Sequence, residues 1–190
     1  THGNLLRMSA SVMQSRIEMR GDGTSKVISW LPAAHIAERG ANYYTPVLVG
    51  LEIHICPDPR RIVEFLPKVN PTWFFAVPRI WEKLKAGLEA QLASLPDEQR
   101  QGAEAGLQAA VKKVQLEQAG EPVPDELAAA VAEADEKLFI HLRRSLGLND
   151  YMAVSVGAAP TSVEVLEFFH AIGIKVGELW GLSETCGVVT

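Results

Sequence analysis

Short apolar runs recur along the chain, and most are rich in β-branched or aromatic residues and close at a glycine or a proline. Runs of this length and composition are typical of β-strands. Because the apolar residues follow one another instead of alternating with polar ones, helices are expected to cover both faces of the strands. The pattern predicts strands over residues 26–31, 51–56, 72–77, 152–156 and 174–180.

Patterns typical of helices fill the intervals between these runs. Asp58 followed by Pro59 predicts an N-cap and a first helical turn, in a helix that ends near Lys68. Residues 161–164, Thr-Ser-Val-Glu, have the spacing of a capping box, in which a hydroxyl and a carboxylate satisfy backbone donors reciprocally. Gly173 is expected to end the helix that follows. The buried face of that helix is predicted to consist of Val163, Leu166, Phe169 and Ile172.

The stretch 94–135 differs from the rest of the chain. It is rich in Ala, Glu and Gln, and it contains no run that resembles a strand. Proline and glycine near residues 96 and 120–124 divide it, which predicts a solvent-facing helical hairpin. Elsewhere the alternation of strands and helices favours an α/β fold with a mostly parallel sheet flanked by helices. Residues 1–190 are therefore interpreted as a portion of one domain that carries residues 94–135 as a helical insert.

Charge and cysteine usage narrow the classes of function. The formal net charge is −5, the pI is near 5.6, and Lys and Arg form no cluster, which argues against nucleic acid as a partner. Cys56 and Cys186 fit no metal-ligand spacing, so a reducing, cytoplasmic setting is expected. No apolar run approaches the ~18–20 residues that span a bilayer. The chain begins without Met and ends inside an apolar stretch, and we expect it to be a piece of a longer protein.

The segment 177–185, Gly-Glu-Leu-Trp-Gly-Leu-Ser-Glu-Thr, has the residue types that a nucleotide site needs. Trp180 offers a flat face to a purine, and Gly181 lets the backbone approach a ligand closely. The hydroxyl of Ser183 can donate to a phosphate oxygen, and the carboxylate of Glu184 can hold Mg²⁺. The order of these residues therefore favours a phosphate-bearing ligand at the end of a strand.

Two other interpretations of this segment have to be weighed. It can be a strand end with a core Trp and an exposed acidic turn, and the residues alone leave that alternative open. Gly181, Leu182 and Ser183 also begin like the nucleophile elbow of hydrolases. The elbow needs glycine where this chain has Thr185, which argues against a hydrolase.

A second turn of small residues, 155–160, lies between a predicted strand and the helix that begins near residue 162. Small side chains allow close approach of the backbone, and a helix start supplies free N–H groups. Taken alone this is weak support for a site, because tight turns between strands and helices need small residues for packing as well.

Together these motifs resemble the adenylate-forming superfamily of acyl-CoA synthetases and luciferases, in which an aromatic-Gly-x-Thr-Glu motif and a small-residue loop embrace the adenylate. Three further segments resemble the long-chain fatty-acid branch of that superfamily, namely 29–39, 77–83 and 1–5. The resemblance covers almost the whole chain except the Ala/Glu-rich stretch. It departs from the usual pattern in having Trp180 for Tyr and Ser183 for Thr.

The resemblance implies roles for individual residues. Gly157, Ala158 and Ala159 would line the adenine pocket, with Leu179 and Trp180 closing it and Gly181 completing the nucleotide contacts. Ser183 would contact the α-phosphate, and Glu184 would bind Mg²⁺. His35 would lie near the acyl carboxylate and the path of the incoming thiol; its alternative is a buried structural histidine. Glu38 and Arg39 are interpreted only as an ion pair on a helix.

The resemblance further implies that the full-length protein converts a long-chain fatty acid to acyl-adenylate with ATP and then to acyl-CoA with CoA, and that this piece alone is inactive. The family's phosphate loop and C-terminal lysine would lie outside it, and it would be the central portion of an AMP-binding N-terminal domain. Alternatives are a fatty-acyl-AMP ligase that loads a carrier protein, or a non-catalytic nucleotide-binding member. The expected location is the cytoplasm, with peripheral membrane association left open, and exposed apolar surface would favour self-association.

Overall fold

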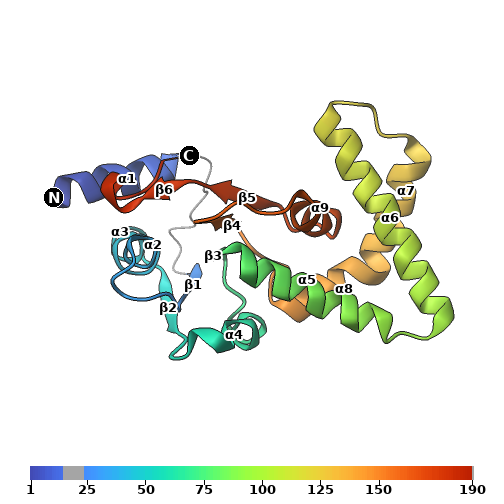
Figure 1. The fold of residues 1–190 in the computed structure, drawn as a ribbon, viewed down its shortest axis with the longest axis horizontal. Coiled ribbons are helices and arrows are strands. Elements are labelled where there is room, and N and C mark those ends of the chain that lie inside the picture. Colours follow the sequence, from blue (N-terminus) through green and yellow to red (C-terminus); the bar gives the residue numbers. More distant parts are fainter. Residues whose placement is uncertain (15–23, 190) are drawn as a thin grey trace.

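A parallel sheet forms the centre of the molecule, whose computed structural model describes residues 1–14 and 24–189 (Figure 1). Strand β4 (Ala153–Gly157) lies between β3 (Trp73–Ala76) and β5 (Val176–Leu179), and both pairings are parallel. Strands β1 (Lys26–Ser29) and β2 (Glu52–Ile55) form a second parallel pair. This arrangement confirms the predicted α/β class and the parallel pairing.

The two groups of strands are joined through Thr72, the residue before β3. Its amide donates to the carbonyl of Lys26 at 3.0 Å, and its hydroxyl accepts from the amide of Lys26 at 2.9 Å. The strands therefore follow one another in the order β2, β1, β3, β4, β5. Because all of them run in the same direction, the loops that leave their carboxyl ends meet at one edge of the sheet, where α/β folds bind ligands.

All five predicted strands are present; four are shorter than predicted, and β4 is shifted by one residue from the predicted 152–156. The expectation that helices cover both faces is wrong for β2, where 72% of Ile55 and 43% of Ile53 are exposed. Strand β2 is at the edge of the sheet and pairs only with β1 among the described strands. A continuous apolar run therefore does not guarantee that both faces of a strand are covered.

Helices connect the strands. The predicted cap at Asp58 is confirmed, because its side chain accepts from the amide of Arg60 and opens a short turn that leads into α4 (Ile62–Val69). The remaining elements are α1 (His2–Gln14), α2 (Ile36–Arg39), η1 (Gly40–Tyr44), α3 (Thr45–Val49), η2 (Pro59–Arg61), α5 (Pro78–Ala93), η3 (Asp135–Phe139), α8 (Ile140–Leu146), β6 (Gly181–Leu182), η4 (Ser183–Thr185) and β7 (Gly187–Val188).

Helix α9 (Val163–Ala171) corrects two expectations. Its N-cap, Ser162, makes no side-chain capping bond within the described part of the chain, so the capping box is wrong. Glu164 instead pairs with Lys85 at 2.9 Å, and that ammonium lowers the pKa of the Glu164 carboxyl. The predicted buried face is confirmed at Phe169 and Ile172, with Leu166 packed against the core, and is wrong only at Val163, of which 65% is exposed. Gly173 ends the segment with a positive φ of 82°, as predicted. The buried residues of the helix are Val165, Phe168, Phe169 and Ala171.

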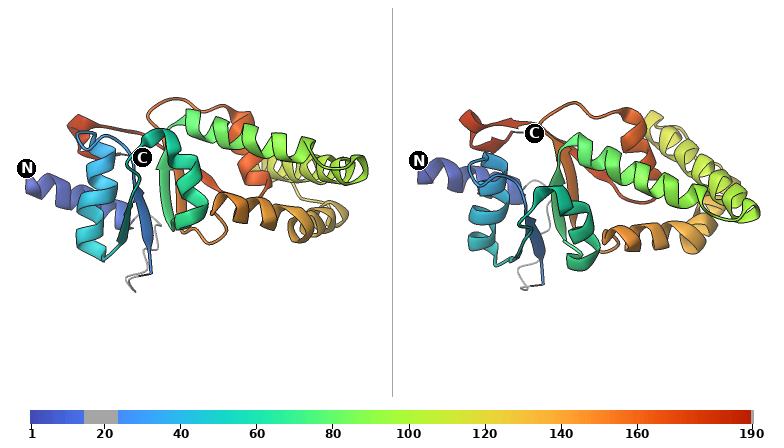
Figure 2. Two further views of the ribbon diagram at one scale, coloured as in Figure 1. Left: turned by 90° about the horizontal axis from the view of Figure 1, so that it is seen from below. Right: turned by 60° about the horizontal axis from the view of Figure 1, so that its bottom comes forward.

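The stretch 94–135 contains α6 (Asp97–Ala119) and α7 (Asp125–Ala134), which form a helical hairpin at one end of the molecule (Figures 1 and 2). Helix α6 is not wholly solvent-facing, because Ala103, Ala110 and Val114 are buried. It lies against α9, where Gln115 donates to Glu167 at 3.0 Å. Helix α1 and strand β6 lie at the opposite end of the molecule. None of the described helices is both long and apolar enough to cross a bilayer.

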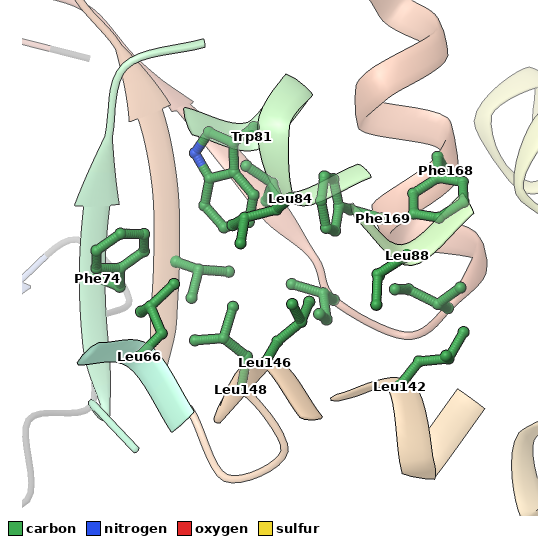
Figure 3. Packing of buried hydrophobic residues seen from close by; sticks show 14 of the residues in the cluster. Leu66, Phe74, Trp81, Leu84, Leu88, Leu142, Leu146, Leu148, Phe168 and Phe169 are labelled. Carbon is green, nitrogen blue, oxygen red and sulfur yellow. The ribbon is translucent and has the colours of Figure 1, made fainter. Parts of the chain in front are cut away.

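The main core lies on one side of the sheet, under α4, α5, α8 and α9 (Figure 3). Trp81 is fully buried at its centre, with its ring centroid 5.9 Å from Phe74 and 4.9 Å from Phe169. The indole N–H of Trp81 donates to the carbonyl of Ser155 at 3.3 Å, which ties α5 to β4. This packing fixes β3, β4 and β5 and therefore the loops at their carboxyl ends.

Candidate functional site

A cavity of about 100 Å³ opens at the carboxyl edge of the sheet, and its surface is mostly apolar. It brings together the end of β5, the loop after β4, the first turn of α2 and one side of α1. Five of the predicted site residues line it, namely His35, Ala158, Leu179, Trp180 and Gly181.

Strand β3 separates this cavity from the core. Successive side chains of a strand point to opposite faces of its sheet. Phe74 and Ala76 belong to the core, while Trp73 and Phe75 line the cavity. The indole nitrogen of Trp73 is buried and has no hydrogen-bond partner within the described residues. Alternate residues of this apolar run therefore pack in the core and line the cavity.

His35 is the N-cap of α2, and its side chain is exposed. Its Nδ1 accepts from the amide of Ala37 at 3.1 Å, so a neutral ring carries its proton on Nε2. His35 is also among the residues that line the cavity. The alternative of a buried structural histidine is wrong.

Glu38 is fully buried, and the predicted ion pair with the exposed Arg39 is wrong. The carboxylate of Glu38 accepts from the hydroxyl of Ser29 at 2.5 Å and from the amide of Leu31 at 3.1 Å. The side-chain amide of Asn42 donates to it at 2.8 Å. Glu38 therefore belongs to the interior of the loop that carries His35.

The turn after β4 places only one of its small residues at the cavity. Ala158 lines it and has a positive φ of 69°, which is uncommon outside glycine. Gly157 is buried inside the sheet, where an added Cβ would lie 2.4 Å from the carbonyl oxygen of Leu179. Ala159 is exposed and is not among the residues that line the cavity. Gly157 thus permits the close approach of β4 and β5, and the structure does not bring it to the cavity wall.

The motif around Trp180 forms a small antiparallel hairpin of β6 and β7. The hydroxyl of Thr185 closes it, accepting from the amide of Leu182 at 3.1 Å and lying 2.9 Å from the carbonyl of Gly187. Trp180 precedes the hairpin and is 56% exposed. It is therefore not the core Trp of the plainer interpretation, and its ring is accessible to a ligand.

Ser183 and Glu184 occupy the turn of this hairpin and are exposed, outside the residues that line the cavity. No group of three or more His, Cys, Asp and Glu gathers within the described residues. Mg²⁺ in nucleotide sites is commonly held by one or two carboxylates together with substrate phosphates and water. An exposed, single carboxylate at Glu184 fits that mode of binding, in which the nucleotide supplies the other oxygens.

Several cavity residues were not predicted to belong to a site. Met8 and Val12 come from α1, a helix that the sequence interpretation did not include. Their i, i+4 spacing places them on one helical face, which was an available indication. Trp73 and Phe75 were predicted as strand residues only, because a continuous apolar run does not reveal which residues face a cavity.

Comparison with known proteins identifies the family. The profile of the AMP-binding enzyme family, described as "AMP-binding enzyme", matches residues 1–190. The chain belongs to this family. The resemblance to adenylate-forming enzymes inferred from the motifs is thereby confirmed.

Similar family members include proteins named as fatty-acid–CoA ligases. The chain is 40% identical over 191 residues to fadD11 of Mycobacterium tuberculosis, a match that covers 100% of this chain and 33% of that protein. It is 32% identical over 168 residues to the long-chain-fatty-acid–CoA ligase ACSBG2 of Rattus norvegicus, covering 85% of this chain and 24% of that protein. The chain thus spans a third or less of the length of these relatives.

Solved structures with the same fold are adenylation domains. One is from the carboxylate reductase of Mycobacterium chelonae, with a TM-score of 0.56 and 19% identity over 86% of this chain and 21% of that one. Another is the A-PCP didomain of carboxylic acid reductase from Segniliparus rugosus, with a TM-score of 0.56 and 17% identity over 99% of this chain and 22% of that one. At these identities the likeness establishes the fold as that of the adenylate-forming enzymes.

Proposed function

We propose that this chain forms the central part of the AMP-binding domain of a long-chain fatty-acid–CoA ligase that requires ATP, Mg²⁺ and CoA. One observation carries the proposal: a single cavity joins the exposed aromatic of the nucleotide motif, Trp180, to an apolar wall made by Trp73 and Phe75. An apolar compartment beside a nucleotide motif suits a substrate with a hydrocarbon chain and a carboxylate to be activated. The names of the relatives favour CoA over a carrier protein as the acceptor.

The proposed reaction has two steps. A carboxylate oxygen of the fatty acid attacks the α-phosphorus of ATP, the bond to the bridging oxygen breaks, and pyrophosphate leaves. The sulfur of CoA then attacks the acyl carbonyl carbon, the bond to the AMP oxygen breaks, and AMP and the thiol proton depart. Both steps depend on positioning and on stabilising charge at phosphorus and at the carbonyl oxygen.

Residues of this chain would contribute as follows. Trp180 would stack on the adenine, with Ala158 and Leu179 beside it, and Ser183 would donate to an α-phosphate oxygen. Glu184 would hold Mg²⁺, which neutralises phosphate charge when bound. Gly157 and Ala159 would act through the shape of the turn that presents Ala158. The Nε2–H of His35 would face the activated carboxyl group.

The direct test uses purified full-length protein. We expect ATP–pyrophosphate exchange that depends on a long-chain fatty acid and Mg²⁺, followed by acyl-CoA formation when CoA is added. The 190-residue chain alone, under the same conditions, is expected to form no acyl-CoA, because the donors to the departing pyrophosphate are expected outside it. Exchange with a fatty acid but transfer only to a carrier protein would identify a fatty-acyl-AMP ligase. A full-length protein that binds nucleotide without exchange would be a non-catalytic member.

Replacing Trp180 with Ala is expected to weaken ATP binding about fivefold, since an aromatic contact contributes on the order of 1 kcal/mol beyond area burial. Trp180→Tyr keeps an aromatic face and should bind ATP nearly as the wild type does. Calorimetric titration of both variants with ATP measures the effect. Unaltered binding by Trp180→Ala would show that the adenine stacks elsewhere.

Replacing His35 with Ala is expected to slow thioester formation more than pyrophosphate exchange. The reason is that the Nε2–H donor of His35 would matter most when charge develops on the acyl carbonyl oxygen. Single-turnover transfer from preformed acyl-adenylate to CoA, compared with exchange, separates the two steps. Equal losses in both would assign His35 to substrate binding instead.

A further inference from the structure

The fully buried carboxylate of Glu38 has no role in the proposed chemistry, yet three donors converge on it. Its oxygens accept from the hydroxyl of Ser29, the amide of Leu31 and the side-chain amide of Asn42. No cationic side chain pairs with it within the described residues, so its burial depends on these three bonds. A carboxylate removed from water is costly unless it is hydrogen-bonded, so such an arrangement implies a specific structural demand.

The three donors lie on either side of the loop that carries His35. Ser29 ends β1 and Leu31 follows it, whereas Asn42 is in η1, beyond α2. The connecting residues 32–34 are exposed, and the amide of His35, which follows them, donates back to the carbonyl of Pro32 at 2.8 Å. Trp30 also holds the start of the loop, because it stacks on Phe74 in the core. Glu38 is the group that bonds to both arms of the loop, whose residues 32–35 are exposed.

We propose that Glu38 is a positioning residue, which holds the loop 30–37 so that the imidazole of His35 stays at the wall of the cavity. Only the activity test of this proposal rests on the function proposed above. The structural part of the proposal is that Glu38 bonds to both arms of the loop and thereby restricts where the His35 ring can lie.

The hydrogen-bonding pattern makes a sharp distinction between two substitutions. In Glu38→Gln the amide oxygen can take over the bonds from Leu31 and Asn42, which share Oε2. The amide nitrogen then faces Ser29, whose hydroxyl can turn from donor to acceptor. Glu38→Gln should therefore preserve the anchor, while Glu38→Ala removes it.

In the full-length protein, Glu38→Ala is expected to slow thioester formation about tenfold, since displacing a reacting group by ~1 Å costs that order or more. Pyrophosphate exchange should fall less than about twofold, because the ATP contacts lie elsewhere. Glu38→Gln should match the wild type in both steps. In a His35→Ala background, Glu38→Ala should cause no further loss of transfer, because residues that act as a unit are not additive.

Three outcomes would overturn the proposal. A Glu38→Gln variant as impaired as Glu38→Ala would mean that the charge itself matters. Equal losses of exchange and transfer would indicate a general structural role. An undiminished loss in the His35→Ala background would show that Glu38 does not act through His35.

If the Glu38→Ala variant fails to fold, a double variant can take its place in the test. Ser29→Ala combined with Glu38→Gln leaves the new amide nitrogen without its acceptor and is expected to reproduce the selective loss of transfer, whereas either change alone should be mild. Tyr151→Phe is the matched control for lost stability, since it removes hydrogen bonds to Lys175 and Gly173 at the opposite ends of the strands. A Tyr151→Phe variant of equal stability loss should show no selective loss of transfer.

A readout independent of activity keeps the two proposals distinguishable. In protein labelled with ¹⁵N-histidine, the His35 ring should give the Nε2–H tautomer in the wild type and in Glu38→Gln, and an averaged signal in Glu38→Ala. The signal is assigned by its loss in His35→Ala. If the wild type forms neither adenylate nor thioester, the proposed function fails, and the ring signal still tests Glu38. An unchanged ring signal in Glu38→Ala would overturn the positioning role.

Discussion

Replacing Glu184 with Gln in the full-length protein is expected to lower fatty-acid-dependent pyrophosphate exchange at least about 100-fold, or ~2.7 kcal/mol in the barrier. Mg²⁺ is a hard cation that prefers a charged carboxylate to a neutral amide. Among the described residues no group of three or more His, Cys, Asp and Glu gathers that could hold the ion in place of Glu184. The side chain is exposed, so the substitution should leave the fold intact.

Exchange at saturating fatty acid, measured over a range of Mg²⁺ concentrations, tests this expectation. Glu178→Gln is the matched control, because Glu178 is also exposed and lies at the end of the preceding strand. That variant should exchange at the wild-type rate and have the same thermal unfolding midpoint. Glu184→Gln exchanging as fast as the wild type would rule out a metal role for Glu184.

A second large effect is expected from Gly181→Ala. An added Cβ would lie 2.0 Å from the carbonyl oxygen of Gly187 and 3.0 Å from the Cα of Val188. Both contacts are with backbone, so no side-chain rotation can relieve them, and β6 and β7 must separate. Ser183 and Glu184 lie in the turn between these strands and would move with them. Pyrophosphate exchange should therefore fall by about 100-fold or more, since small displacements of positioned groups carry costs of that order.

The fold should survive Gly181→Ala, because the hairpin is largely exposed and contributes nothing to the main core. Gly177→Ala is the control from the same segment: an added Cβ there would lie 3.9 Å from the nearest carbonyl oxygen, an ordinary contact. It should retain exchange. A Gly181→Ala variant with full exchange would mean that the hairpin does not position the phosphate-binding residues.

The elements that the sequence could predict are those that depend on local interactions. Strands such as β3 and β4 were predicted from composition, because β-branched and aromatic side chains favour extended backbone wherever they occur. The turn at Gly173 and the cap at Asp58 were also predictable, since both depend on bonds between residues adjacent in the chain. Such local interactions need no partner from elsewhere.

Other expectations failed because they depended on a distant partner. Glu164 has the spacing of a capping residue, yet its carboxylate pairs with Lys85, which the sequence gives no reason to place nearby. Val163 has the spacing of the apolar face that packs Phe169 against Trp81, but it lies at the first position of the helix and stays 65% exposed, because nothing in the described structure covers that end. The presence or absence of a tertiary partner decided both cases.

The candidate site divides in the same way. The sequence by itself determined the motif of Trp180, Gly181, Ser183 and Glu184, because these chemical groups are neighbours in the chain. Only the tertiary structure decided that Trp73 and Met8 face the same cavity as Trp180, and that Glu38 is an internal anchor. A cavity is bounded by residues far apart in the chain, and burial depends on what packs above a residue. Neither quantity is a property of local sequence, which is why both had to come from the fold.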